Sequence, residues 1–442
     1  MKIHSSTLLA IAACALAPMA HASVSVRSDD VSLGLRLQLQ VRAEKAWASN
    51  VVFPNRTSSY VSMYNVPEGR NGEPDDLDFY IRRARLGFSG TWRQNYKFSY
   101  ILRNDNQDKT GGSATTAPAI TSPGPNTANH THTVTVGTPN RVPQTHVAFV
   151  ERIFKQEDLG LEHAVRMGLD YAWFNGSSAV FSSGSFLFPT ARATEQGAML
   201  APRGIGVGYK LSHKMFALGL DVQNNTGDDN SNAGSALQGE GLFYGARVHL
   251  IPFDSDEKGH MRPVESFVGK EGTGVLISAE FGVNQNDNTS NTQTVNTKAY
   301  GFEVLGHWDG LTGLLEWRQA IQNIDNRTGA DARRVSTCYL IQAGYALPFG
   351  DQFLEPALRL TKLNLDGGAG EFAPYGSSEY GASGRSFDLG VNYYIHGHNN
   401  KLQLAWQHWS AEKTVRVQVA PNKFENKRPD ADIVRLQWQL NF

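Results

Sequence analysis

Basic side chains occupy some of the alternate, non-apolar positions of several segments, where they could act together on an anion. The densest case is the stretch from Asp78 to Arg103, in which Arg83 and Arg85 alternate with apolar residues. Arginine stays charged, and its planar fork can hold phosphate or carboxylate through two hydrogen bonds. Extending the alternation along the chain places these basic residues on one common wall: Arg36, Arg42, Arg83, Arg85, Lys97, Arg103 and Arg435. The pattern predicts a surface that attracts anions.

The elements that would carry these residues are β-strands. From Leu33 to Val41, apolar residues occupy alternate positions, with glycine, arginine and glutamine between them. A period of two residues is typical of a strand with one apolar and one polar face. The stretch from Asp78 to Arg103 shows the same alternation on both sides of a short reversal. The dipeptide Asp309-Gly310 predicts another tight hairpin.

About sixteen such strands follow one another, joined alternately by short turns and long polar loops. No apolar run approaches the about 20 residues of a transmembrane helix. The mean hydropathy of −0.37 is that of a soluble protein, but a barrel gives a similar value because half of each strand faces a polar lumen. The sequence predicts an all-β fold, a transmembrane antiparallel β-barrel with short periplasmic turns and long extracellular loops. The alternative, a soluble β-sandwich, gives no reason for the unequal loops.

The N-terminus has the features of an export signal. A lysine, an apolar run and an Ala-x-Ala site precede Ser23, which predicts cleavage after Ala22. We therefore expect residues 1–22 to be a signal peptide and residues 23–442 to be the barrel domain. In a second interpretation, Cys14 is the lipidated residue of a lipobox. Once the signal is removed, Cys338 is the remaining cysteine, so no intramolecular disulfide can form.

Two long segments interrupt the strands. Residues 105–143 have low complexity and cannot bury enough apolar surface to order themselves. Residues 174–203, rich in glycine, serine, phenylalanine and proline, are predicted to fold into the barrel. Arg192 and Arg203 on this segment, together with Arg166, are the candidate constriction residues. The alternative for the two arginines of the segment is a solvated loop.

The predicted inward charges are unevenly distributed. Basic residues concentrate on the last strand and the first three, which adjoin once the barrel closes, whereas inward acids lie mostly on the strands between them. A basic wall facing an acidic wall produces a field across the lumen, so anions would follow the basic side. The competing interpretation is that the arginines pair with lumen acids and hold the barrel and its inserted loop in shape.

Several stretches resemble a known family. FYIRRARLGFSGTW, NYKFSY, FLEPALRL, SFDLGVNYYI, NKLQLAWQHW and the terminal QWQLNF are similar to the phosphate-selective porin family of types O and P. The resemblance spans roughly residues 30–442. It implies an outer-membrane barrel of about sixteen strands, usually a homotrimer, that passes anions such as phosphate. The chain departs from the family's usual Lys-Pro-Phe run at residues 170–174, and its 105–143 segment is unusually long.

Enzymatic and metal-binding functions find little support. The chain has no Gly-x-Ser-x-Gly, His-Glu-x-x-His or P-loop motif, so we expect neither an enzyme nor a cofactor. The pairs His130/His132 and His396/His398 offer two ligands each, which is weak evidence for a metal site. A formal net charge of −1 gives no reason to expect nucleic acid as a partner.

The expected partners are those of an outer-membrane barrel in a Gram-negative bacterium. They are small phosphate-like anions as permeants, together with outer-membrane lipid and lipopolysaccharide. The loop acids Asp228, Asp229 and Asp287 could bridge to lipopolysaccharide through divalent ions, but a solvated polar surface is the favoured interpretation of these acids. The last strand ends on Phe442, a pattern that resembles the signal recognised by the barrel-assembly machinery. Two functions of different class remain: a water-filled channel for passive diffusion of small anions, or a non-conducting barrel that acts as a surface-binding or adhesion protein.

Overall fold

The structure is a computed structural model. It describes residues 25–28, 30–48, 53–54, 60–61, 77–105, 114–116, 120–122, 130–132, 135–137, 143–173, 183–190, 192, 203–224, 241–255, 263–269, 272–290, 293–326, 331–366, 383–412, 415–420, 423–427 and 430–441. Within these ranges, no helix has the length and apolar character needed to cross a membrane. The predicted signal peptide 1–22 with Cys14, the loop acids Asp228 and Asp229, and Phe442 lie outside the described residues.

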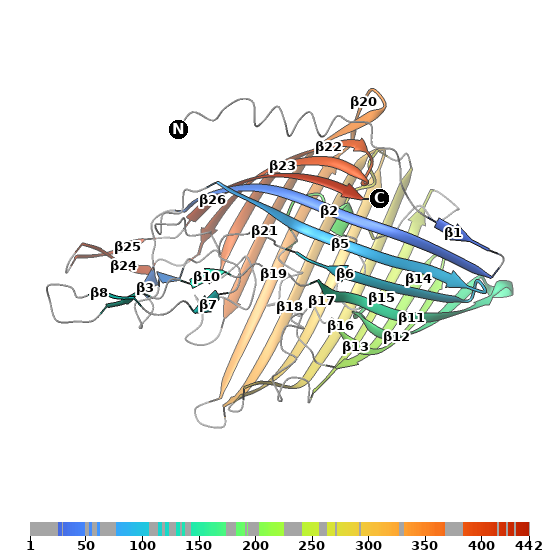
Figure 1. Cartoon of the computed structure of the whole chain (residues 1–442), viewed down its shortest axis with the longest axis horizontal. Helices are drawn as coiled ribbons and strands as arrows, with labels where there is room; N and C mark the ends of the chain where they lie inside the picture. The colour runs from blue at the N-terminus through green and yellow to red at the C-terminus, as the bar shows by residue number, and fades with distance from the viewer. Residues whose placement is uncertain are drawn as a thin grey trace.

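Sixteen antiparallel strands form a closed barrel, as predicted. Each strand pairs with the next in the chain, and the last pairs with the first, which closes the wall (Figure 1). The strands are β2 (Val31–Ala48), β5 (Asp78–Trp92), β6 (Tyr96–Arg103), β11 (Gln144–Gln156), β12 (Leu161–Tyr171), β13 (Arg203–His213), β14 (Phe216–Asn224), β15 (Leu242–Asp254), β16 (Thr273–Ser290), β17 (Gln293–Trp308), β18 (Leu311–Asn326), β19 (Ala332–Tyr345), β21 (Gln352–Asp366), β22 (Gly384–His396), β23 (Asn400–Ala411) and β26 (Asp430–Asn441). Closure leaves no unpaired edge in the wall.

Shorter strands extend the wall or lie outside it. β1 (Ser25–Arg27) pairs with the start of β2, and β20 (Leu347–Phe349) pairs with the start of β21. The remaining short strands form four separate two-stranded ladders. They are β3 (Phe53–Pro54) with β4 (Tyr60–Val61), β7 (Ala114–Thr116) with β10 (Thr135–Gly137), β8 (Ile120–Ser122) with β9 (His130–His132), and β24 (Val415–Ala420) with β25 (Lys423–Lys427).

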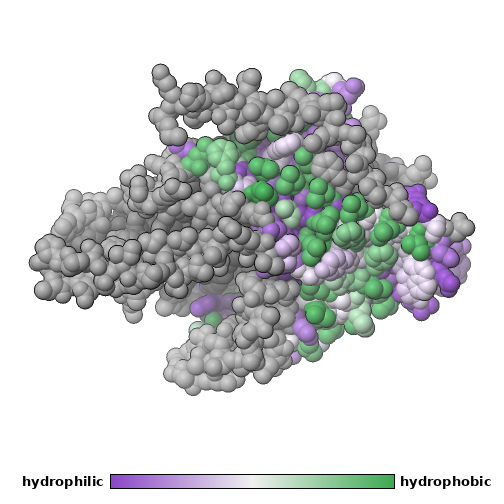
Figure 2. Space-filling view, in the orientation of Figure 1, coloured by the Kyte–Doolittle hydropathy of each residue, from purple (hydrophilic) through white to green (hydrophobic). Residues whose placement is uncertain are grey.

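The outer face of the barrel is apolar. Side chains such as Val150, Ile341 and Leu404 are more than half exposed on this face. Their alternation with buried polar residues such as Gln342 and Gln403 fixes which face of each strand points outward. Figure 2 shows hydrophobic side chains across the wall, with hydrophilic ones beyond them at the turn end. Such a surface is stable in hydrocarbon rather than in water.

Tight turns connect the strands at one end. Asp309 and Gly310 both have positive φ, 42° and 85°, which is the backbone of the predicted two-residue hairpin. Arg93 and Gln94, with φ of 48° and 57°, form a comparable turn between β5 and β6. These turns set the pairing of each hairpin and therefore which residues enter the lumen.

A β-bulge interrupts the arginine-rich strand at Arg82. Gln40 of β2 pairs with Arg83, but the next residue, Val41, pairs with Ile81. Arg82 is thus the extra residue, which explains the break in the apolar row of the sequence. The bulge keeps Arg83 on the inward face and also turns Tyr80 inward, where it is buried.

One expectation about the loops is wrong. The Asn-rich run that contains Asp287 was predicted as a loop, but it continues β16 to Ser290, and Asp287 pairs with Val295 of β17. This extension has polar residues at successive positions, so it lacks the alternation by which a strand is recognised. Backbone pairing, which is independent of side-chain polarity, holds the two strands together.

Candidate anion pathway

A segment between β12 and β13 lies inside the barrel. We call the described residues 183–190 and Arg192 the loop-side segment. Residues 184–190 and Arg192 are all buried. Side chains of the wall hold the segment through its carbonyl groups: Lys401 Nζ donates to Phe186 O at 2.8 Å, and Asn392 Nδ2 donates to Leu187 O at 2.9 Å. The predicted infolding is therefore present in the described part of residues 174–203.

Arginines of the barrel wall also bind the next two residues of the loop-side segment, Pro189 and Thr190. Arg42 donates to Pro189 O, and Arg359 Nη2 donates to Thr190 Oγ1 at 2.6 Å. The guanidinium of Arg359 also lies 4.6 Å from the centre of the Phe188 ring. These cations bind neutral oxygens and an aromatic ring of the protein itself, so part of the basic lumen is used to position the segment.

Glycine at the inner wall makes room for the loop-side segment. A Cβ atom added to Gly390 would meet the Phe188 ring at 2.9 Å, and one added to Gly344 would meet Leu187 Cδ1 at 2.8 Å. Both distances are shorter than van der Waals contact, so a larger residue would displace the segment.

A second segment enters the lumen from the opposite end, between β15 and β16. We call residues 263–269 the turn-side segment. Its Glu265, Ser266 and Phe267 are each 1% exposed. Ser266 donates to Glu355 at 2.9 Å, and its carbonyl oxygen is 2.9 Å from His398 Nε2.

The two segments meet at Glu265. Its carboxylate accepts hydrogen bonds from Leu187 N at 3.0 Å, from Arg192 Nη1 at 2.8 Å and from Gln342 Nε2 at 3.0 Å. Arg192 also lies 3.1 Å from Glu316 on β18. Arg192 is thus shared between a carboxylate of the wall and one of the turn-side segment.

Both segments also pack on an apolar patch inside the barrel. Phe186 and Phe267 form one buried cluster with leucines on the inward faces of four neighbouring strands. These are Leu276, Leu305, Leu314 and Leu340. Phe267 further stacks on His307, with ring centres 4.4 Å apart. Burial of these side chains stabilises the two segments against the β16–β19 wall.

The opposite side of the lumen carries a basic arc, which we define as Arg36, Arg83, Arg85 and Arg103 on β2, β5 and β6. Arg85 and Arg103 are directly opposite each other across β5 and β6. Arg36 is exposed, whereas Arg85 and Arg103 are partly buried. Like charges in opposed positions destabilise a sheet, so the arc favours a nearby anion.

Arg83 is the most deeply placed residue of the arc, at 6% exposure. Its Nη1 donates to Gln40 Oε1 at 2.7 Å, and its guanidinium lies 5.7 Å from the Phe186 ring centre. In the described part of the chain no carboxylate lies within ion-pair distance of Arg83, and its Nε has no hydrogen-bond acceptor. A buried cation in this state is costly unless an anion approaches it.

Asp105, just beyond the end of β6, is a carboxylate that contacts the arc. It forms an ion pair with Arg85 at 2.6 Å. Burial by itself raises the pKa of Asp105, but the charge and hydrogen bond of Arg85 outweigh this effect. The pKa of Asp105 therefore lies below its ordinary value of 3.8, and the carboxylate stays ionised at neutral pH.

The other predicted wall residues have different surroundings. Arg435 lies 2.8 Å from Glu44 and donates to Gln407, and Arg42 donates to Gln437. These two arginines belong to a buried network. Lys97 is about half exposed near the turn between β5 and β6, 4.0 Å from Glu151.

The three candidate constriction residues lie on different elements and have mostly different partners. Arg192 alone lies on the loop-side segment. Arg203 is the first residue of β13 and contacts His146 and the Tyr171 ring. Arg166, on β12, pairs with Asp170 and Asp221. The sequence places Arg203 at the end of the infolded segment, whereas backbone pairing with Tyr171 makes it part of the wall.

The acidic side of the lumen is balanced by arginine. Glu303 and Glu316 are directly opposite each other on β17 and β18. Arg247 pairs with both Glu280 and Glu303, and Arg318 lies 3.3 Å from Glu280. The competing interpretation, in which arginines pair with lumen acids, therefore describes this side of the barrel.

Metal ligands do not cluster in the described residues, where no group of three histidine, cysteine or acidic side chains could hold an ion. His398 is instead placed against Ser266 of the turn-side segment.

Sequence reasoning missed Glu265 and the inward leucines. The sequence does contain a signal for both. Val264 and Phe267 are apolar residues within a turn, and the four leucines occupy inward positions next to charged ones, as in Leu314 beside Glu316. Apolar residues facing a lumen indicate that something packs on them.

Comparison with known proteins adds independent evidence on the family of the arginine-rich hairpin. The family model described as phosphate-selective porin O and P matches residues 58–146, which include the arginine-rich hairpin. No curated protein is similar enough to the chain to match it.

Solved structures resemble the whole barrel. OmpT, an outer membrane protein of Vibrio cholerae, is 8% identical with a TM-score of 0.50, over 95% of this chain and 99% of that chain. The outer membrane channel DcaP of Acinetobacter baumannii is 11% identical with a TM-score of 0.49, over 95% and 100%. An anion-selective porin from Comamonas acidovorans is 8% identical with a TM-score of 0.49, over 93% and 100%. The resemblance to the phosphate-selective porin O and P family is thus confirmed over the arginine-rich hairpin, and the described chain has a closed antiparallel β-barrel fold that it shares with OmpT, an outer membrane protein.

Proposed function

We propose that the protein forms a water-filled channel in the outer membrane through which small anions diffuse passively, phosphate and other oxyanions among them. It then acts as a channel and not as an enzyme. The observation that carries this proposal is Arg83, a buried cation with no carboxylate in ion-pair distance among the described residues. An anion beside Arg83 would offset the cost of burying its charge.

The basic arc supports a route for the anion. Along β5, the inward positions run from Arg83 to Arg85 and then to Gly87, which is opposite Arg36 of β2. Successive inward positions of a strand are roughly 7 Å apart. An anion can therefore pass from one guanidinium to the next without leaving the field of the arc. Arg36 is exposed, so the route is accessible to water.

The two lumen segments define the other side of this route. Both pack against the β16–β23 side of the barrel, and Phe186 of the loop-side segment faces Arg83. The apolar patch and Glu316 contact these segments, and we assign the arc to the charged surface that faces the pathway. We assign Arg192 to the positioning of the constriction, and Arg36, Arg83, Arg85 and Arg103 to anion contact.

The proposal has further parts that come from the sequence and the family resemblance. The chain is exported with residues 1–22 as its signal peptide, leaving residues 23–442 as the barrel domain. It is inserted by the barrel-assembly machinery through the strand ending in Phe442, and it functions as a homotrimer among outer-membrane lipid and lipopolysaccharide. Light scattering of the purified protein in detergent tests the trimer, and a monomer mass contradicts it.

The alternative function is a non-conducting barrel that binds ligands at the cell surface. The observation in its favour is that two segments enter the lumen, with residues 184–190, Arg192 and residues 265–267 buried there. Recording from single molecules in a planar bilayer separates the two functions. A channel shows discrete conductance steps in potassium chloride, and added phosphate reduces the chloride current by competing at the arc. The absence of steps, with protein shown to be inserted, supports the closed barrel.

A further inference from the structure

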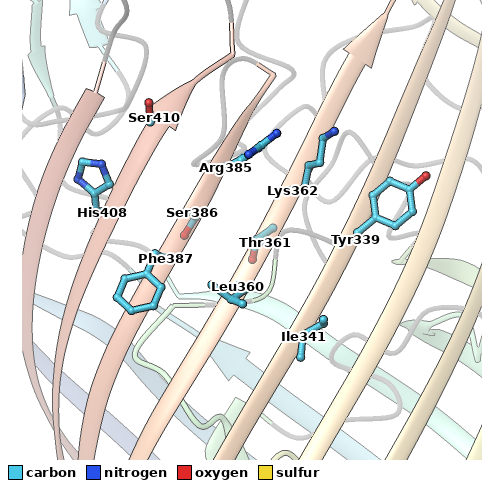
Figure 3. A pocket seen from close by; sticks show the side chains of 10 residues that line it. All are labelled: Tyr339, Ile341, Leu360, Thr361, Lys362, Arg385, Ser386, Phe387, His408 and Ser410. Carbon is cyan, nitrogen blue, oxygen red and sulfur yellow. The ribbon is translucent and has the colours of Figure 1, made fainter.

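A groove of about 410 Å³ lies on the outer face of the barrel, away from the lumen. Its lining comes from β19, β21, β22 and β23. On β21, β22 and β23 the lining residues lie near the strand ends that connect to the long loops. Figure 3 shows Lys362 and Arg385 at one end of this groove, with Leu360, Ile341 and Phe387 at the other. The groove is therefore polar at the rim and apolar toward the middle of the barrel.

Two cations face each other at the rim. Lys362 and Arg385 are directly paired across β21 and β22. Like charges in this position are destabilising without a counterion. Glu412 supplies one negative charge, 3.4 Å from Lys362 Nζ and 3.8 Å from Arg385 Nε. The three groups together keep a net positive charge, and the Arg385 side chain is 72% exposed.

The floor of the groove is a continuous apolar surface. Leu360 is directly paired with both Ile341 and Phe387. The same outward row continues toward the middle of the barrel through Leu358, which pairs with Leu389. Leu358, Leu360, Leu389 and Ile341 are all exposed. An acyl chain lying along this row would bury them.

We propose that this groove binds a phosphorylated lipid of the outer leaflet. The phosphate lies between Lys362 and Arg385, where charge-assisted hydrogen bonds hold it, and one acyl chain lies over Leu360, Phe387 and Leu358. The cationic rim lies toward the loop end of the barrel and the apolar floor lies toward its middle. A lipid has the same arrangement, because its charge lies at the membrane boundary and its acyl chain extends toward the membrane centre. A soluble protein partner has no such fixed order of charge and hydrocarbon, and the oligomer mass distinguishes a lipid from a second copy of the chain.

The test measures lipid binding to the purified full-length barrel in detergent, independently of conduction. The probe is bis-phosphorylated lipid A, and bound lipid is counted by native mass spectrometry. Replacing both cations (Lys362→Gln with Arg385→Gln) should weaken binding by about tenfold or more. The matched control is Arg152→Gln, because Arg152 is an exposed cation on β11, on the same outward face as its partner Val165 but near the turn end.

Each outcome decides the proposal. Weaker binding in the double variant and unchanged binding in Arg152→Gln support it. Equal binding in all three proteins overturns it, as does equal binding of lipid A from which the phosphates have been removed. Displacement of the lipid by millimolar inorganic phosphate would show a free-phosphate site instead. A lower oligomer mass in the double variant, with lipid binding unchanged, would show that a second copy covers the groove.

If the double variant does not assemble, Leu360→Trp tests the apolar floor without changing any charge. It should weaken binding of lipid A while leaving the cations in place. Unchanged binding in Leu360→Trp contradicts the placement of the acyl chain.

Discussion

Glu265 and Arg192 form an ion pair of 2.8 Å that joins two segments entering the lumen from opposite ends. The pair is almost fully buried, with side-chain exposures of 1% and 0%. Neither residue lies on a strand of the wall. The placement of the two segments therefore depends on a contact between them as well as on their contacts with the barrel.

Replacing Glu265 with glutamine should loosen this contact. Arg192 still forms an ion pair with Glu316, so its buried charge remains paired. Leu187 N, Arg192 Nη1 and Gln342 lose a charged hydrogen-bond acceptor. The loss should cost about 2 kcal/mol of stability. We expect a larger and noisier single-channel conductance, measured in a planar bilayer. Ser266→Ala is the control, because it changes the same segment without touching Arg192, and an equal increase there would refute the role of the ion pair.

The basic arc should control anion preference. Replacing Arg83 and Arg85 together with glutamate reverses two charges that face the lumen. The reversal potential in a salt gradient should therefore shift strongly toward the equilibrium potential of the cation. Arg152→Glu, at an exposed position on the outward face of β11, should shift it far less. Equal shifts in the two variants would show that Arg83 and Arg85 do not face the pathway.

The sequence predicts much of this architecture because its signals are local. Alternation from Leu33 to Val41 and the Asp309-Gly310 turn each require only neighbouring residues, and the barrel reproduces both. The bulge at Arg82 is visible only as a break in the apolar row, because its cause is the pairing of β5 with β2.

The contact between the two lumen segments is harder to predict because it joins residues that are far apart in the sequence. Glu265 becomes recognisable only when Leu187, Arg192 and Gln342 surround it. In the same way, the alternation of apolar and polar residues in the sequence predicts that the side chains of Arg435 and Arg83 both point into the lumen. Their surroundings differ because Arg435 meets Glu44 whereas Arg83 meets Gln40.

This difference between Arg435 and Arg83 is itself testable. Arg435→Gln removes a buried guanidinium from Glu44 and Gln407, which should cost about 3 kcal/mol of stability because it breaks a buried ion pair. The reversal potential should change little, since Arg435 does not belong to the arc. Thermal unfolding in detergent measures the first effect and bilayer recording the second. A loss of anion preference as large as in the Arg83 and Arg85 variant would place Arg435 on the pathway.

Asp105 should limit the anion preference of the arc. Asp105→Asn removes the negative charge that pairs with Arg85, so anion preference should rise at neutral pH. Because the folded pKa lies below 3.8, the stabilisation from this pair is complete above that value and is lost as the pH falls through the folded pKa. The difference in reversal potential between variant and wild type should therefore be the same at about pH 5 and pH 7. A difference that disappears by pH 5 would contradict the ionised state of Asp105.

The reversal potential of the wild-type channel in a gradient of potassium chloride tests the central claim most directly. The basic arc should hold the potential on the side of the chloride equilibrium potential, and raising the salt concentration should weaken this preference because the charges are screened. A reversal potential on the potassium side, or inserted protein that gives no channels, would contradict an anion pathway along Arg36, Arg83, Arg85 and Arg103.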